Sequence, residues 1–304
     1  MAKTVFITGG SGLLALNWAI KIRNSHKVIL GIHNRKIELS GVRVLQSNLE
    51  SVNHLQREFE ILQPDLVIHT AGLTSVEACE AHPEMARYIN VNLAVNVAKA
   101  STKSGISFVQ ISTDHLFEGI DADLDENTPV SPLNIYGITK AEAEAAVLEA
   151  NPNALVIRTN FYGWGPVYRH SFSDVIIEHL KLKKDLTLFT DVFYNPILAE
   201  TLAETVLDLV ALKKAGIYHV IGDDRISKYG FGLKLAEIFQ LDHSCLKKGL
   251  LSEQHTLVKR PADMSLSNKK ATKETGKKIG GVDEQVRRLH EQETSGLAHE
   301  IRNI

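Results

Sequence analysis

The fold is decided near the start of the chain, by Val5-Phe6-Ile7-Thr8-Gly9-Gly10-Ser11-Gly12-Leu13-Leu14-Ala15. The spacing Gly9-x-x-Gly12-x-x-Ala15 is typical of a strand that runs into a tight turn and then a helix. The first glycine permits the turn, the second lets the backbone approach a pyrophosphate, and the third position needs a small side chain. The stretch predicts a dinucleotide site rather than an ordinary turn, with these cofactor-binding residues: Gly9, Ser11, Gly12, Leu13 and Leu14.

Short β-rich segments alternate with helical patterns over the first half of the chain. We expect strands over residues 4–8, 27–32, 66–70, 106–112 and 154–158. We expect helices over residues 12–24, 52–62, 83–104 and 136–150. This alternation predicts an α/β fold, a Rossmann-like doubly wound parallel sheet with right-handed crossovers.

The pattern changes after Arg158. Residues 160–166 are rich in aromatic residues and glycine, which is typical of a loop. We expect helices over 173–182, 198–213 and 227–239, strands over 186–189 and 216–220, and an exposed helical tail over 283–299. The expected division is an NAD(P)-binding domain over 1–160, with returning segments near 197–225, and a smaller C-terminal substrate-binding lobe with the tail over 161–304.

Composition excludes several classes of function. The net charge of −2 gives no electrostatic case for nucleic acid or an anionic membrane as a partner. The two cysteines lie far apart and the 13 histidines lack a metal-binding spacing, so we expect neither a disulfide framework nor a metal site. No apolar run is long enough for a membrane span, and no signal-peptide pattern precedes the first strand. We therefore expect a reduced, cytoplasmic protein.

The end of the second predicted strand indicates which dinucleotide is bound. NAD sites carry an acidic residue there for the ribose 2′-hydroxyl, whereas NADP sites use basic groups around the 2′-phosphate. This chain reads Gly31-Ile32-His33-Asn34-Arg35-Lys36, with no carboxylate before Glu38. Arg35 offers a forked set of donors that suits a phosphate. We favour NADP (as NADPH) over NAD, with His33, Asn34 and Arg35 at the adenosine end; the alternative is a solvated basic turn.

A second polar cluster carries the expected chemistry. Tyr136 and Lys140 are four residues apart, so a helix places phenol and ammonium on one face, where the positive charge should lower the pKa of Tyr136. Thr113 follows an apolar strand in Ile111-Ser112-Thr113-Asp114-His115 and should project where open α/β sheets bind ligands. We predict three catalytic residues: Thr113 binds a substrate oxygen, Tyr136 protonates it, and Lys140 holds the nicotinamide ribose. The alternatives are a strand-end cap and an exposed lysine.

Together these motifs resemble the extended short-chain dehydrogenase/reductase superfamily, and within it the dTDP-4-dehydrorhamnose reductase family. The likeness reaches to about residue 270 and includes Asp65-Leu66-Val67-Ile68-His69-Thr70-Ala71, Val76-Glu77-Ala78-Cys79-Glu80-Ala81-His82-Pro83, Ser112-Thr113-Asp114-His115-Leu116-Phe117-Glu118-Gly119 and Arg260-Pro261. It implies further cofactor contacts from Asn48, Leu49, Thr70, Ala71, Gly72 and Asn90, besides Tyr136 and Lys140. It implies a substrate site of Thr74, Val76, Glu77, Thr113, Asp114, His115, Asn160 and Arg260.

The resemblance implies a reaction and an assembly. The expected reaction is reduction of a nucleotide-activated 4-keto-6-deoxy sugar at C4 by NADPH. The helices over 83–104 and from 136 are where this superfamily forms a dimer, so a homodimer is expected. Arg260 either captures the diphosphate of the substrate or forms a surface ion pair.

Three residues depart from the family pattern and keep other functions open. His115 stands where the reductases have Tyr and related dehydratases have Glu, Phe161 where Trp is frequent, and Ile197 where Thr is common. One alternative is a sugar-nucleotide epimerase with tightly held NAD. Another is a non-catalytic NADP-binding regulatory subunit, because Gly216–Gly222 with Ser227-Lys228-Tyr229 is similar to the beta subunit of methionine adenosyltransferase.

Overall fold

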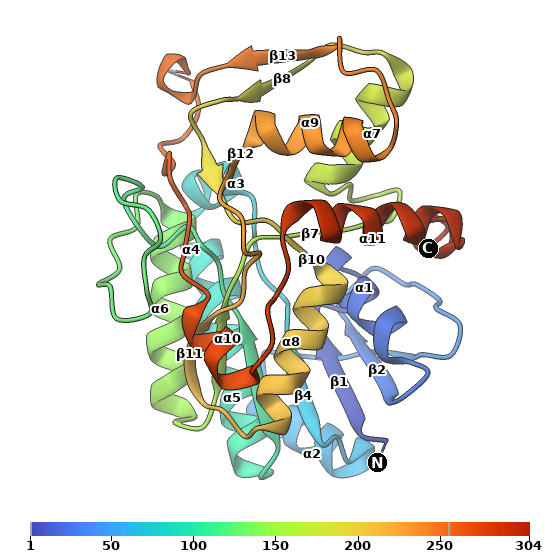
Figure 1. Ribbon diagram of the computed structural model, residues 1–304. Coiled ribbons are helices and arrows are strands. Elements are labelled where there is room, and N and C mark those ends of the chain that lie inside the picture. Colours follow the sequence, from blue (N-terminus) through green and yellow to red (C-terminus); the bar gives the residue numbers. More distant parts are fainter. Residues whose placement is uncertain (1, 255) are drawn as a thin grey trace.

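The computed structural model describes residues 2–254 and 256–304, and its centre is a seven-stranded parallel sheet. Its strands are β1 (Thr4–Thr8), β2 (Lys27–Ile32), β3 (Arg43–Gln46), β4 (Leu66–His69), β5 (Ser107–Ile111), β6 (Leu155–Arg158) and β11 (Gly216–His219). They lie in the order β11-β6-β5-β4-β1-β2-β3, of which Figure 1 labels β11, β4, β1 and β2. The order reverses between β1 and β4, which is where doubly wound sheets bind ligands. The predicted fold class is confirmed, and β3 is a strand that the sequence pattern missed.

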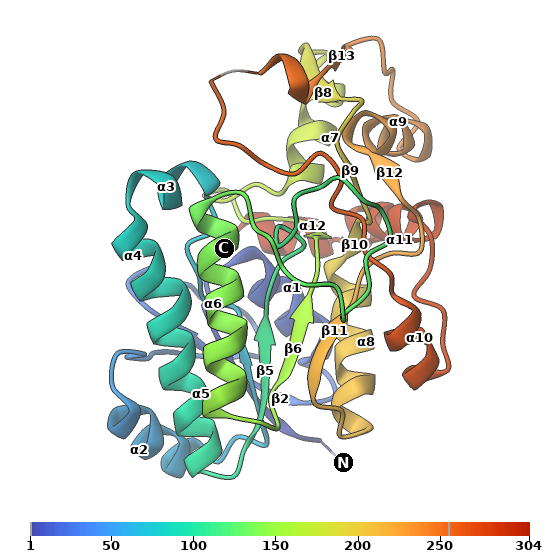
Figure 2. The ribbon, with the colours of Figure 1, turned by 90° about the vertical axis from the view of Figure 1, so that its left-hand side faces the viewer.

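Helices cover both faces of this sheet. They are α1 (Leu13–Ile22) and α8 (Ala199–Ala211) on one face, and α2 (Val52–Leu62), α5 (Leu93–Lys103) and α6 (Ile135–Ala150) on the other (Figure 2). Because β1 is covered on both sides, Val5, Phe6 and Ile7 are all fully buried. Val5 and Ile7 face one apolar core, and Phe6 faces the other, where its ring meets Phe59 edge-on.

The long helix expected over residues 83–104 is interrupted. A short helix α3 (Val76–Ala81) precedes α4 (Pro83–Arg87), and a π-helical turn η1 (Tyr88–Asn92) joins α4 to α5. The expectation of one regular helix was therefore wrong. A π-helical turn inserts an extra residue and rotates the side chains that follow, and such turns often occur at functional sites. Here the turn contains Asn90, which is buried.

Short, separate strand pairs and two helices build an upper lobe (Figure 1). The pairs are β7 (Phe161–Tyr162) with β10 (Ile197–Leu198), β9 (Phe193–Tyr194) with β12 (Ile226–Ser227), and β8 (Leu186–Phe189) with β13 (Leu246–Gly249). The helical elements are α7 (Phe172–Leu182), α9 (Lys228–Ile238) and the short turn η2 (Leu251–Glu253), whereas α10 (Lys269–Thr275) packs lower down, against α8 and β11. The predicted loop over 160–166 was wrong at β7, which is only two residues long and pairs with a strand far along the chain.

The C-terminal tail is helical, as α11 (Val282–Thr294) and α12 (Leu297–Arg302), but the expectation that it is exposed was wrong. Val286 and Leu289 are fully buried and belong to the main apolar core. With Val282 they form an apolar stripe at helical spacing, which the many charged residues between them obscure in the sequence. The Nε1 of Trp164 also donates a hydrogen bond to the Leu289 carbonyl at 3.2 Å.

One apolar core extends from the sheet into the upper lobe. It contains Val5 and Ile7 of β1 together with Ile176 of α7, Leu188 of β8 and Phe231 of α9. The division of the chain at residue 160 therefore stays a proposal. Within the described ranges 2–254 and 256–304, no helix is both long and apolar enough to cross a membrane.

Candidate active site

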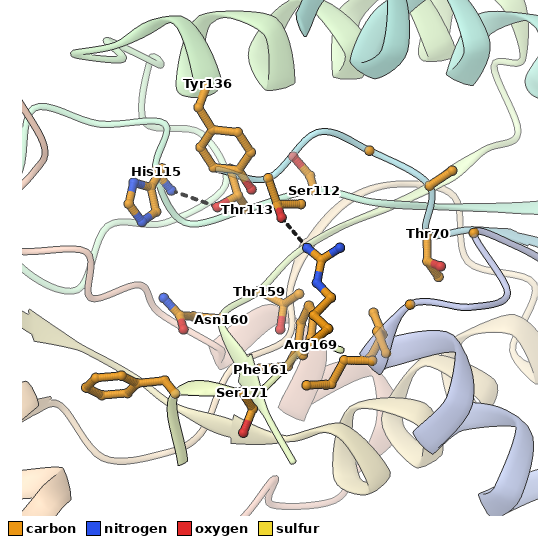
Figure 3. A pocket seen from close by; sticks show the side chains of 18 of the residues that line it. Thr70, Ser112, Thr113, His115, Tyr136, Thr159, Asn160, Phe161, Arg169 and Ser171 are labelled. Carbon is orange, nitrogen blue, oxygen red and sulfur yellow. Dashed lines mark hydrogen bonds between the residues drawn. The ribbon is translucent and has the colours of Figure 1, made fainter. Parts of the chain in front are cut away.

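A pocket of about 690 Å³ opens at the carboxyl end of the large sheet (Figure 3). Its walls come from the residues that follow β1, β2, β4, β5 and β6, and from the loop before α7. Sequence-predicted site residues that line it are Gly9, Ser11, Gly12, Leu13, Leu14, Arg35, Thr70, Ala71, Gly72, Thr74, Val76, Thr113, Asp114, His115, Tyr136 and Asn160. The sheet thus brings together residues from most of the motifs in one cavity.

The glycine-rich turn closes tightly between β1 and α1. The Gly12 amide donates to the Gly9 carbonyl at 2.8 Å, and Gly9 has a φ of +66°. A Cβ atom on Gly9 would lie 2.8 Å from the backbone of Ala71, a contact that real structures avoid. Glycine is therefore required here both for the backbone conformation and for the close approach of the two loops.

The loop after β4 is held against this turn from both sides. The Thr70 hydroxyl donates to the Thr8 carbonyl at 2.7 Å. The Asn90 side chain accepts from the Leu73 amide at 2.7 Å and donates to the Leu73 carbonyl at 3.1 Å and to the Thr139 hydroxyl at 3.0 Å. Asn90 lies behind the pocket wall rather than in it, and it fixes the backbone that passes the pocket.

Thr113, Asp114 and His115 form a connected group at the end of β5. The Thr113 hydroxyl donates to Asp114 Oδ1 and accepts from the His115 amide, both at 3.2 Å. The other oxygen of Asp114 accepts a hydrogen bond from the Asn160 amide. Burial lowers the pKa of His115, and the nearby Asp114 charge opposes that shift. The His115 imidazole is therefore neutral near neutral pH.

Tyr136 enters the same group from the start of α6 (Figure 3). Its ring packs edge-on against His115, with the centroids 5.7 Å apart. Burial raises the pKa of Tyr136 to about 12, while Thr113 and the positive charge of Arg169 oppose that increase. The expectation that Lys140 lowers this pKa was wrong in this structure, because desolvation dominates and the opposing charge comes from Arg169.

Lys140 lies one turn further along α6 but does not line the pocket. Its Nζ donates to the Ile111 carbonyl at 2.7 Å, at the end of β5. Only 6% of the residue is exposed, and burial lowers its pKa to about 8. The buried ammonium is therefore positioned by the β5 backbone.

Several other predicted residues lie outside the pocket wall. His33 and Asn34 are exposed next to Arg35. Asn48 accepts from the Glu50 amide at 2.9 Å, and Leu49 packs on the apolar core beneath α2. Glu77 and Arg260, both expected at the substrate, form an ion pair with each other.

Several pocket residues were missed by the sequence analysis, some of them in the loop before α7. They are Ser112 and Thr159 at strand ends, Phe161 in β7, and the run Tyr168, Arg169, His170, Ser171 and Phe172. Arg169 extends from the Phe161 side toward the side of Tyr136 and Thr70 (Figure 3) and donates to the Thr74 hydroxyl at 2.6 Å. A signal was present in Ser171 and Asp174, which form a capping box that starts α7 and ends this loop.

This arrangement suits chemistry on an alcohol or a ketone. The glycine-rich turn, which is shaped for a pyrophosphate, faces the same cavity as the hydroxyl groups of Thr113 and Tyr136. A bound dinucleotide and a second ligand could therefore meet there. Across residues 2–254 and 256–304, no group of His, Cys, Asp and Glu side chains could hold a metal ion.

Comparison with known proteins identifies relatives over most of the chain. A family model described as the RmlD substrate binding domain matches residues 3–295. The spore coat polysaccharide biosynthesis protein SpsK of Bacillus subtilis is 30% identical over 276 residues, which are 90% of this chain and 91% of that protein. Methionine adenosyltransferase 2 subunit beta of Bos taurus is 31% identical over 81% of this chain and 75% of its own length.

Solved structures show the same fold. A dTDP-4-dehydrorhamnose reductase from Clostridium acetobutylicum has a TM-score of 0.81 at 25% identity and covers 96% of this chain and 99% of its own. A second such reductase, from Bacillus anthracis in complex with NADP, has a TM-score of 0.82 at 23% identity, with coverages of 96% and 100%.

Proposed function

The chain belongs to the RmlD substrate binding domain family, and from that premise we propose that it is an NADPH-dependent reductase of a nucleotide-linked 4-keto-6-deoxy sugar. One observation carries the proposal. The glycine-rich turn, Thr113 and Tyr136 line a single pocket of about 690 Å³, large enough for the reacting parts of two ligands. The catalytic roles below belong to the same proposal.

NADPH supplies the hydride when it is bound. Tyr136 delivers a proton to the oxygen of the substrate, since its pKa of about 12 keeps the phenol protonated at neutral pH. Thr113 orients that oxygen, for which its hydroxyl must turn away from Asp114 Oδ1. Lys140 holds the nicotinamide ribose, for which its buried ammonium must reach past the Ile111 carbonyl into the pocket. The charge of Arg169 stabilises the phenolate that forms as the proton leaves.

Support for NADPH comes from Arg35. Its guanidinium lies at the edge of the pocket, and the end of β2 carries no carboxylate to accept a ribose 2′-hydroxyl. The Bacillus anthracis reductase with this fold binds NADP. The proposed substrate fits the name of SpsK, which places a relative in polysaccharide biosynthesis. A homodimer and a cytoplasmic location remain proposals.

A second candidate is a non-catalytic NADP-binding regulatory subunit. The similarity to methionine adenosyltransferase 2 subunit beta favours it, because that relative spans most of the chain. A sugar-nucleotide epimerase remains a third candidate, and protein that purifies with tightly bound NAD would favour it.

The test is a titration of the purified protein with NADPH and NADH, followed through nicotinamide fluorescence. A panel of nucleotide-linked 4-keto sugars is then added. Tight binding of NADPH, and its oxidation by one of the sugars, would support the reductase and identify the substrate. Binding of NADPH with no oxidation by any sugar, together with purification of a partner enzyme, would favour the regulatory subunit.

A further inference from the structure

The loop Pro166–Ser171 crosses from the upper lobe to the glycine-rich turn. The Tyr168 hydroxyl donates to the carbonyl of Ser11 at 2.9 Å, and Ser11 belongs to that turn. The ring of Tyr168 lies 4.0 Å from the guanidinium carbon of Arg35. Tyr168 therefore connects the turn proposed to bind the pyrophosphate with the arginine proposed to select the cofactor.

The loop is held in place at both ends. The amides of Gly165 and Ser171 donate to the same carboxylate oxygen of Asp174, at 2.8 and 2.9 Å. Within it, the Arg169 amide donates to the Pro166 carbonyl at 2.9 Å, and a Cβ on Gly165 would lie only 2.2 Å from the Arg169 carbonyl oxygen. The backbone that carries Tyr168 is thus fixed before any ligand binds, which lowers the entropic cost of ordering the site.

The charge of Arg35 is available to an anion. Among the residues that the structure describes, 2–254 and 256–304, Arg35 forms no ion pair with a carboxylate. Stacking occupies the face of the guanidinium and leaves the N–H donors along its edge free for a phosphate. An exposed arginine otherwise samples many rotamers, so an aromatic ring at 4.0 Å restricts it to the pocket side.

We propose that Tyr168 is a positioning residue that holds Arg35 where the 2′-phosphate of NADPH binds, and so sets the preference for NADPH over NADH. This inference rests on the proposed function in one respect, the use of NADPH. It predicts that a residue from the upper lobe, more than 130 positions along the chain from Arg35, determines a property of the dinucleotide-binding half.

The test compares dissociation constants for NADPH and NADH, because these ligands differ only by the 2′-phosphate. Tyr168→Leu removes both the ring and the hydroxyl, and Tyr168→Phe keeps the ring. With a cation–π contact of ordinary strength, Tyr168→Leu should weaken NADPH by about 3- to 30-fold and change NADH by less than about 2-fold. Tyr168→Phe should keep most of the preference. Tyr168→Gln serves as a second variant without the ring if Tyr168→Leu is poorly folded.

A double-mutant cycle shows whether Tyr168 acts through Arg35. Arg35→Ala should reduce the preference for NADPH, and adding Tyr168→Leu to that variant should then change the NADPH to NADH ratio little. The pair 2′,5′-ADP and 5′-AMP should reproduce the result, because these fragments report the 2′-phosphate without the nicotinamide end.

Two outcomes would overturn the inference. One is an equal loss of NADPH and NADH affinity in Tyr168→Leu, which would assign Tyr168 to support of the turn alone. The other is a double variant, Arg35→Ala with Tyr168→Leu, in which Tyr168→Leu lowers the preference for NADPH over NADH as much as it does in the wild-type protein. If the wild-type protein shows no preference for NADPH, the cofactor in the proposed function is wrong as well. If wild type prefers NADPH and Tyr168→Leu keeps that preference, only this inference fails.

Discussion

The two walls of the pocket are built in different ways. The wall from the first half of the chain consists of residues that follow parallel strands, such as Gly9 after β1 and Thr113 after β5. The wall from the second half is mainly the loop before α7, which carries Tyr168 and Arg169 and is held by Asp174. Sheet topology alone places the first wall, whereas the second depends on contacts between residues far apart in the sequence. The predictions below test whether the proposed catalytic residues lie in the first wall, and whether residues of the second wall adjust how those residues act.

The largest expected effect is on Tyr136, in the first wall. Tyr136→Phe removes the proposed proton donor and leaves the ring that packs on His115. We expect kcat for the sugar substrate to fall by about 10²- to 10⁴-fold, with the dissociation constant of NADPH changed by less than about 3-fold. Steady-state kinetics and fluorescence titration measure the two quantities.

Tyr229→Phe is the matched control, since it makes the same chemical change at a tyrosine outside the pocket wall. It should turn over at the wild-type rate. Turnover of Tyr136→Phe close to that of this control would contradict the proposed mechanism.

The next effect concerns Gly9, where the glycine-rich turn closely approaches the loop after β4. Gly9 and Gly105 share a φ of +66°, but a Cβ on Gly9 would lie 2.8 Å from the Ala71 backbone, whereas one on Gly105 meets nothing within 4 Å. Gly105→Ala should cost about 1 kcal/mol of unfolding free energy, from the backbone conformation alone. Gly9→Ala should cost at least 1 kcal/mol more and weaken NADPH about 10-fold or more. Urea unfolding and NADPH titration of both variants give the difference.

Equal destabilisation by the two alanines, with normal NADPH binding by Gly9→Ala, would show that the loops can move apart. The first wall would then be less rigid than its close contacts indicate.

The first wall could be predicted from sequence because its signals are local. The spacing of Gly9 after a strand places it in the turn that follows the strand. The four-residue spacing of Tyr136 and Lys140 places both on one face of a helix. Arg169 carries no such signal, because its role depends on how the loop after β7 crosses the pocket. The pKa of Tyr136 was mispredicted for a related reason: helical spacing predicts that Lys140 lies nearby, but not that burial outweighs it. The buried face of α11 was missed because charged residues separate its apolar ones.

Arg169 tests whether the second wall adjusts the chemistry of the first. Its charge lowers the pKa of Tyr136 against the effect of burial. Arg169→Gln should raise that pKa further and make the phenol a weaker acid, so kcat should fall by about 2- to 10-fold. Arg169→Lys keeps the charge and should recover much of the rate. Steady-state kcat of the three proteins measures this, and equal losses in the Gln and Lys variants would assign Arg169 a steric role instead.

The smallest effect asks whether the two halves of the chain unfold together. His69 in β4 and His219 in β11 come from different halves but lie in the same sheet, and burial lowers the pKa of each to about 3. Unfolded histidine titrates near 6.5, so the unfolded state binds more protons between about pH 3 and 6.5. The stabilisation is complete above this window and is lost as the pH falls through it. Each histidine should contribute a slope of up to about 1.4 kcal/mol per pH unit to the free energy of unfolding.

Urea unfolding at pH 7, 6 and 5 measures this slope while most carboxylates remain ionised. If the two halves of the chain unfold in one transition, His69→Gln and His219→Gln should each reduce the same slope by a similar amount. That result is expected, because one apolar core joins β1 to α7 and α9. Two transitions, each with the slope of one histidine, would instead show that β11, the sheet strand from the second half of the chain, unfolds independently of β4. The shared core would then be too weak to join the second half of the chain, which carries Tyr168 and Arg169, to the first half.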